Sequence, residues 1–66
     1  MICTNIKQLR EAQGLSGRAL ARKAGINPGS LSQMERGIRV MSENEILRIE
    51  SALGQPIEII VIVKRA

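Results

Sequence analysis

The chain has 66 residues, in which ten Lys and Arg outnumber six Asp and Glu to give a formal net charge of +4. A chain this short holds one domain, near the lower limit for a core without disulfides or metal, so a partner subunit is expected. The sequence has no His, and Cys3 is its one cysteine. These counts exclude an internal disulfide, a cysteine-rich zinc site and the usual general base near neutral pH. We therefore predict neither enzyme activity nor a cofactor or metal, and the unpaired cysteine suits a cytoplasmic location.

The charge is unevenly distributed along the chain. Residues 1–40 hold seven basic and two acidic side chains, a formal charge of +5, whereas residues 41–66 hold three basic and four acidic ones. A basic segment of this size favours a polyanionic partner, with a solvated charged surface as the alternative. The longest apolar run, residues 59–63, is far shorter than the roughly 20 residues that cross a bilayer, and no signal peptide is visible, so no membrane partner is expected.

Four helices are predicted in chain order, because glycines at positions 14, 25, 37 and 54 stand where helices end in the left-handed conformation. The first helix covers about residues 5–13, and the second opens at Ser16. Asn27 caps the third, which runs from Pro28 to about residue 36. Ser42 and Glu45 have the spacing of a capping box at the start of the fourth. Residues 57–64 are almost all β-branched, which predicts a strand.

The second and third helices are joined by Gly25, Ile26 and Asn27, a three-residue turn typical of a helix-turn-helix. Small bundles also contain such hairpins, so the spacing alone is only moderately specific. The residues themselves make the pattern more specific. They are Leu9-Arg10, Gly14-Leu15-Ser16, Leu20-Ala21, Lys23-Ala24-Gly25-Ile26, Ser30-Leu31-Ser32 and Glu35-Arg36-Gly37. Together they resemble the Cro/CI-type (XRE family) helix-turn-helix domain over about residues 5–54.

This resemblance implies a mainly α, lambda-repressor-like domain of four to five helices, here with a C-terminal β-strand. It implies a transcriptional regulator, chiefly a repressor, that binds double-stranded DNA at a palindromic operator as a homodimer, with the third helix in the major groove. An alternative is an antitoxin-type or adaptor protein that holds a toxin or other protein partner and regulates its own operon.

The sequence departs from the family pattern at three places. Gly17 replaces a Gln that orients on a phosphate, so only backbone N–H groups remain there to bind the anion. Pro28 and Gly29 replace side chains that touch base edges; they either only begin the helix or admit a close approach of the backbone to DNA. The third departure is the strand, where the family often continues with a fifth helix.

Base and phosphate contacts are assigned by these matches. Gln33 is the strongest candidate for base recognition, because its amide can pair with adenine N6 and N7. The full predicted base-contacting set is Asn27, Pro28, Gly29, Ser30, Ser32 and Gln33. The predicted phosphate-contacting set is Arg10, Ser16, Gly17, Arg18, Arg36 and Arg39. The resemblance also implies an ion pair between Arg10 and Glu35, which links the first and third helices.

The predicted strand has two faces. Ile57, Ile59, Val61 and Val63 point one way, and Glu58, Ile60, Ile62 and Lys64 point the other. With no second strand evident, its unpaired edge predicts antiparallel pairing with the same strand of a second subunit. A register with Glu58 opposite Lys64 places the two-fold axis at Val61. The rival prediction pairs this edge with residues 1–4 of the same chain.

Overall fold

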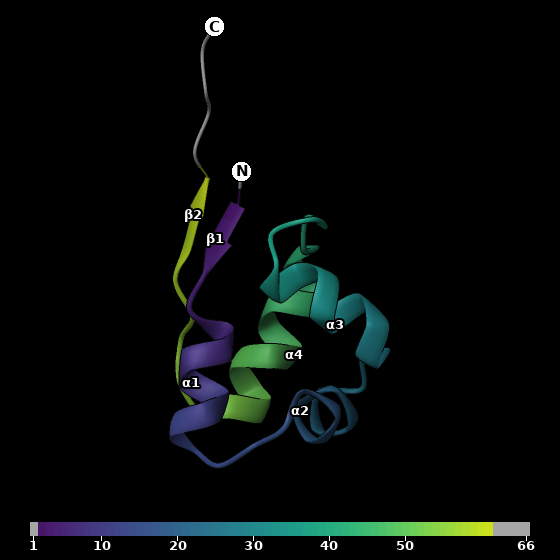
Figure 1. Ribbon diagram of the computed structural model, residues 1–66, viewed down its shortest axis with the longest axis vertical. Helices are drawn as coiled ribbons and strands as arrows, with labels where there is room; N and C mark the ends of the chain where they lie inside the picture. The colour runs from purple at the N-terminus through teal and green to yellow at the C-terminus, as the bar shows by residue number, and fades with distance from the viewer. Residues whose placement is uncertain (1, 62–66) are drawn as a thin grey trace, which may run out of the picture.

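The computed structural model describes residues 2–61, which form four helices and two short strands (Figure 1). In chain order these are β1 (Ile2–Thr4), α1 (Ile6–Ala12), α2 (Gly17–Ala24), α3 (Pro28–Glu35), α4 (Glu43–Leu53) and β2 (Ile59–Val61). The four helices pack together, and the two strands run side by side away from them (Figure 1). The predicted mainly α fold with a C-terminal strand is confirmed.

The helices begin at the polar side chains expected to cap them. Ser16 Oγ and Asn27 Oδ1 accept hydrogen bonds from backbone N–H groups in the first turns of α2 and α3. Ser42 and Glu45 form the complete capping box at the start of α4, with each side chain accepting from the other residue's backbone N–H. The first helix is one residue shorter at each end than the predicted range of residues 5–13. The local sequence therefore determines where these helices start.

The core draws side chains from all four helices. Its largest fully buried side chains are those of Ile6, Leu20, Leu31, Met34 and Ile49. The helix α2 packs against both α3 and α4, so α4 supports the helix-turn-helix pair. Ile57 and Ile59 pack against the same core, as the predicted inward face of the strand requires.

The prediction that the C-terminal strand has no partner within the chain is wrong. The strand β2 pairs antiparallel with β1, placing Cys3 opposite Ile60. This is the rival pairing with the N-terminal segment, and a run of only three strand residues at β1 gives little periodicity from which to predict it. The predicted strand extends to Lys64, but Ile62, Val63 and Lys64 lie outside the described residues.

Pairing with β1 occupies one edge of β2 and leaves the other free of β-pairing among residues 2–61. Asn5 N donates to Glu58 O at 3.3 Å, so these two opposite residues form a hydrogen-bonded pair at the start of the ribbon. Such pairs alternate along an antiparallel ladder. The main-chain groups of Ile59 and Val61 consequently point to the outer edge, away from β1.

Candidate nucleic-acid interface

The turn between α2 and α3 has the geometry of a helix-turn-helix. Gly25 ends α2 with φ of 71°, a left-handed conformation that other residues adopt only with strain. The Ile26 N–H then bonds to Ala21 O at 2.9 Å, which closes the end of α2. Arg48 Nη1 of α4 donates to the Gly25 carbonyl at 3.4 Å. The turn is thus held from both sides before α3 begins.

One face of α3 is buried and the other is exposed. Leu31 and Met34 lie in the core, whereas Pro28, Gly29, Ser32 and Gln33 are exposed. These exposed residues come from the predicted base-contacting set.

The other two members of that set have hydrogen-bond partners within the chain. Asn27 Oδ1 accepts from Gly29 N at 2.8 Å, so this side chain starts the helix, and the half-buried Ser30 accepts at Oγ from Arg39 Nη1 at 2.6 Å. The Gln33 side chain has no hydrogen bond among the described residues, which leaves both ends of its amide available.

An ion pair joins α1 to α3. Arg10 Nε and Nη2 donate to the two carboxylate oxygens of Glu35 at 2.9 and 3.0 Å, and Arg10 Nη1 donates to the Leu15 carbonyl at 3.2 Å. The side chains of Arg10 and Glu35 are only 16% and 9% exposed. The hydrogen bond that Arg10 donates to Glu35 raises the pKa of Arg10 above its usual value, against the opposing effect of burial.

The backbone of Gly17 lies beside this pair. A Cβ built at Gly17 would stand 3.9 Å from the guanidinium carbon and Nη2 of Arg10. Gly17 is the first residue of α2, and Ser16 accepts the Ala19 N–H at 3.1 Å. The structure thereby brings three predicted phosphate-contacting residues, Arg10, Ser16 and Gly17, to the amino end of α2.

A second charged cluster was not predicted from the sequence. Arg39, in the loop after α3, donates from Nη1 to Ser30 Oγ at 2.6 Å and from Nη2 to Glu45 Oε2 at 3.5 Å. The Glu45 carboxylate also accepts from Ser42 N at 2.9 Å, and this bond is the first cause of its lowered pKa. The capping-box motif identified Glu45 as a helix-start residue but gave no signal that it also holds Arg39.

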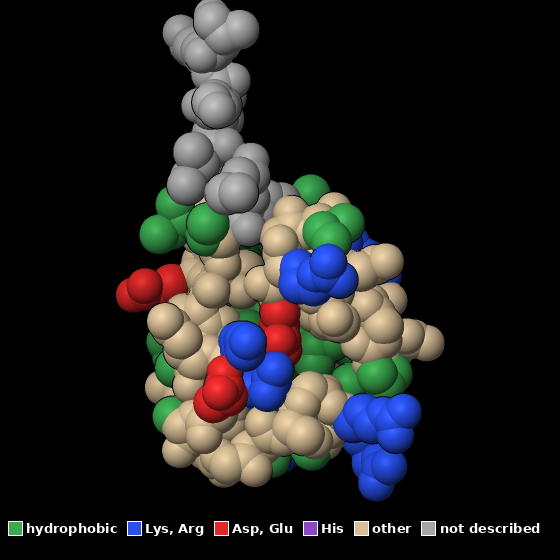
Figure 2. All heavy atoms as spheres, in the orientation of Figure 1, with side chains coloured by type: hydrophobic (Ala, Val, Ile, Leu, Met, Phe, Trp, Pro, Cys, Tyr) green, Lys and Arg blue, Asp and Glu red, His purple; other side chains and the backbone are tan. Residues whose placement is uncertain are grey.

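The remaining predicted phosphate contacts, Arg18 and Arg36, are exposed and basic. Arg18 and Arg22 line a hollow of about 420 Å³ together with Ile26 and Pro28, between α2 and the start of α3. Arg36 ends α3. On the face shown in Figure 2, basic side chains lie in the middle and over the half of the molecule that contains α2 and α3.

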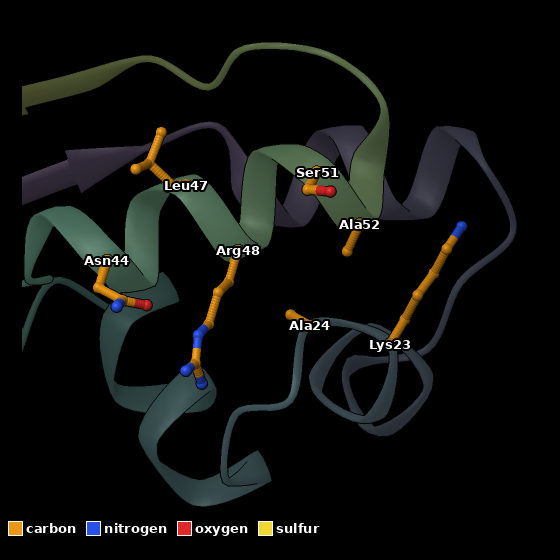
Figure 3. A pocket seen from close by; sticks show the side chains of 7 residues that line it. All are labelled: Lys23, Ala24, Asn44, Leu47, Arg48, Ser51 and Ala52. Carbon is orange, nitrogen blue, oxygen red and sulfur yellow. The ribbon is translucent and has the colours of Figure 1, made fainter.

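Another hollow, of about 480 Å³, lies between α2 and α4 (Figure 3). Its apolar lining is Ala24, Leu47 and Ala52, and Lys23 extends away from it while Arg48 reaches towards the turn after α2 (Figure 3). Within residues 2–61, no His, Cys, Asp or Glu cluster has the composition of a metal site. In the same segment, none of the helices has the length and apolar character of a membrane span.

A capped helix pair with an exposed, polar third helix and basic groups around it defines a DNA-binding helix-turn-helix domain. The chain belongs to the Helix-turn-helix family, whose model matches residues 6–60. It is similar to the restriction-modification controller protein C.AhdI from Aeromonas hydrophila, with 35% identity, a TM-score of 0.76 and coverage of 77% of each chain. No curated protein matches the chain. The family and this structural neighbour identify a DNA-binding transcriptional regulator.

Proposed function

We propose that this regulator binds a palindromic operator as a homodimer and acts as a repressor. The observation that carries the proposal is the exposed face of α3, which presents the Gln33 side chain to solvent. The helix itself is held in place by the ion pair with α1 and by packing against α2. Phosphate contacts supply most of the affinity of such an interface, and base-edge contacts supply its sequence preference.

The amino end of α2 supports the assignment of phosphate contacts. The free N–H groups of Gly17 and Arg18 and the partial positive charge of the helix favour an anion there. The guanidinium of Arg10, although paired with Glu35, lies beside Gly17, and the glycine carries no side chain that would stand between its N–H groups and an anion. We therefore assign this corner to one DNA phosphate in each subunit.

The outer edge of β2 is our proposed dimer contact. Its outward main-chain groups belong to Ile59 and Val61, whereas the Ile57 N–H is already held by Glu50 Oε2 at 2.9 Å. Two-fold pairing of antiparallel strands requires hydrogen-bonded pairs whose residue numbers have a constant, even sum. The register with Val61 on the axis meets this condition. It also leaves the bond between Ile57 and Glu50 intact.

Selection of bound sites from random double-stranded DNA tests the function directly. The expected product is a palindrome whose half-sites lie one helical turn apart, because the two α3 helices of such a dimer sit about 34 Å apart. Recovery of no preferred sequence, or of a site without dyad symmetry, contradicts the proposal.

Salt dependence tests the electrostatic part of the proposal. A dimer that contacts roughly six to ten phosphates loses about 10³–10⁵ in affinity between roughly 50 and 200 mM salt. Fluorescence anisotropy on the selected duplex measures this loss. A flat response to salt contradicts the assigned phosphate contacts.

A further inference from the structure

The loop after α3 is attached to the carboxyl end of that helix. Both Ile38 N and Arg39 N donate to the Gln33 carbonyl, at 2.9 and 3.4 Å. The side chains of Ile38 and Val40 on either side are 63% and 72% exposed, so apolar packing does little to hold this loop. The loop is positioned chiefly by hydrogen bonds.

The Arg39 side chain extends this attachment along the helix. Its backbone bonds to Gln33 and its Nη1 bonds to Ser30 Oγ, and residues three apart lie on the same side of an α-helix. The guanidinium therefore lies along the face that carries Ser30 and Gln33. Because Ser30 Oγ accepts this bond, its own proton is left to donate elsewhere.

Glu45 holds the other side of the guanidinium. One carboxylate oxygen completes the capping box of α4, and the other contacts Arg39 Nη2. The capping bond fixes the carboxylate, so its position does not depend on Arg39. An immobile negative charge beside an exposed arginine restrains where that arginine can reach and offsets part of its attraction for phosphates in general.

We propose that Glu45 is a positioning residue for DNA recognition: it holds Arg39 along the Ser30 and Gln33 face of α3 and so increases discrimination between the operator and other DNA. This inference rests on the proposed function, because it concerns the preference for one site over others. In this proposal Ser30 and Glu45 hold the Arg39 side chain beside the bases. Arg36 contacts the DNA backbone without such a restraint.

The Glu45→Gln variant separates the two roles of Glu45. The Gln amide oxygen can still accept the Ser42 N–H, so the cap and the fold remain, but the charge facing Arg39 is gone. We expect the ratio of affinities for the selected operator and for a scrambled duplex to fall about two- to fivefold, the equivalent of one exposed ion pair. On the scrambled duplex the salt slope should steepen by about 0.9, as one more phosphate is contacted.

The Glu43→Gln variant is the matched control. It removes the same charge from the same turn of α4, and Glu43 has no ion pair in the part of the chain that the structure describes. It should strengthen binding to both duplexes alike and leave their ratio unchanged. Equal ratios for Glu45→Gln and Glu43→Gln would overturn the proposal.

Two further measurements keep the inference distinct from the proposed function. The Arg39→Lys variant keeps the positive charge, but a lysine lacks the planar guanidinium that contacts Ser30 and Glu45 together. The ratio of affinities for operator and scrambled duplex should therefore fall, while the dependence of affinity on salt stays unchanged. Without DNA, the shifts in melting temperature caused by Arg39→Ala and Glu45→Gln should be non-additive in the double variant. Additive shifts overturn the inference even if no operator is found, whereas non-additive shifts without an operator count against the proposed function alone.

Discussion

Gln33 is the residue whose role is most directly testable. Its amide is exposed on α3, and a two-pronged contact with adenine is worth about 1–3 kcal/mol of discrimination. Gln33→Ala should therefore weaken binding to the best site by about that amount and relax one base position in each half-site. Repeating the site selection with the variant measures both effects. Gln8→Ala, on the exposed side of α1, is the control, and an unchanged preferred sequence in Gln33→Ala would remove Gln33 from the base-contacting set.

Glu35 supports α3 through a largely buried ion pair. Glu35→Ala leaves the Arg10 guanidinium with little solvent and no carboxylate, so we expect the free energy of unfolding to fall by about 3 kcal/mol, the lower end of the range for buried pairs. Urea unfolding measures the change.

The control for this pair is Glu11→Ala, an exposed acidic residue on α1. If Glu35→Ala lowers the free energy of unfolding by less than about 1 kcal/mol, the ion pair of Arg10 and Glu35 behaves as a surface salt bridge.

Residues differ in how far their roles could be predicted. The capping roles of Ser16, Asn27 and Ser42 depend on partners within three positions, so local sequence suffices. Arg39 meets Ser30 nine positions away, through a long side chain whose direction only the folded loop determines. Family resemblance supplied the pairing of Arg10 with Glu35, because the 25 positions between them leave no local pattern.

The first turn of α4 makes stability depend on pH. The pKa of Glu45 is lowered, first by the Ser42 backbone N–H and further by nearby arginines. A carboxylate whose pKa is lower in the folded than in the unfolded state stabilises the fold above its unfolded pKa, and this contribution is lost as the pH falls through the folded value.

The Glu45→Gln variant should therefore unfold more easily than the unmodified chain at pH 7, and this difference should shrink below about pH 4. Urea unfolding at both pH values measures it, with Glu43→Gln as the control for loss of charge. A difference that is the same at both pH values would show that the cap does not depend on the ionised carboxylate.

Elements with caps and a long apolar stripe were predictable, and short strands were not. The helix α4 has 11 residues, a capping box before it and Gly54 after it, so both ends are marked. The strand β1 has three residues and no flanking turn signal, and only its partner 59 positions away makes it a strand. Pairing between the ends of a chain depends on the whole fold, which no local window contains.

The outer edge of β2 is a place at which a second copy can extend the sheet. Val61→Pro removes an outward N–H from β2 and leaves the bonds between β2 and β1 in place, since those belong to Ile60 and Glu58. We expect a folded monomer at micromolar concentration with weakened operator binding, measured by sedimentation equilibrium and anisotropy.

The control for the edge is Ile60→Thr, a change on the exposed face of the same strand that keeps every main-chain donor. It should stay dimeric. A dimeric Val61→Pro chain would place the contact elsewhere, and the exposed Leu47 of α4 would be the next surface to test.

The pairing of β1 with β2 also bears on the order in which the molecule folds. It joins Ile2 to Val61, so the chain must close a loop that contains almost the entire sequence before the ribbon gains a bond. The entropy of loop closure grows with the length of the loop, and contacts between distant residues form late. The helices have caps and turns that depend on local contacts, so they are expected to assemble first. They then provide the apolar surface against which Ile57 and Ile59 pack. An ordered outer edge then exists only in a completed monomer, which protects partly folded chains from pairing with one another through β2.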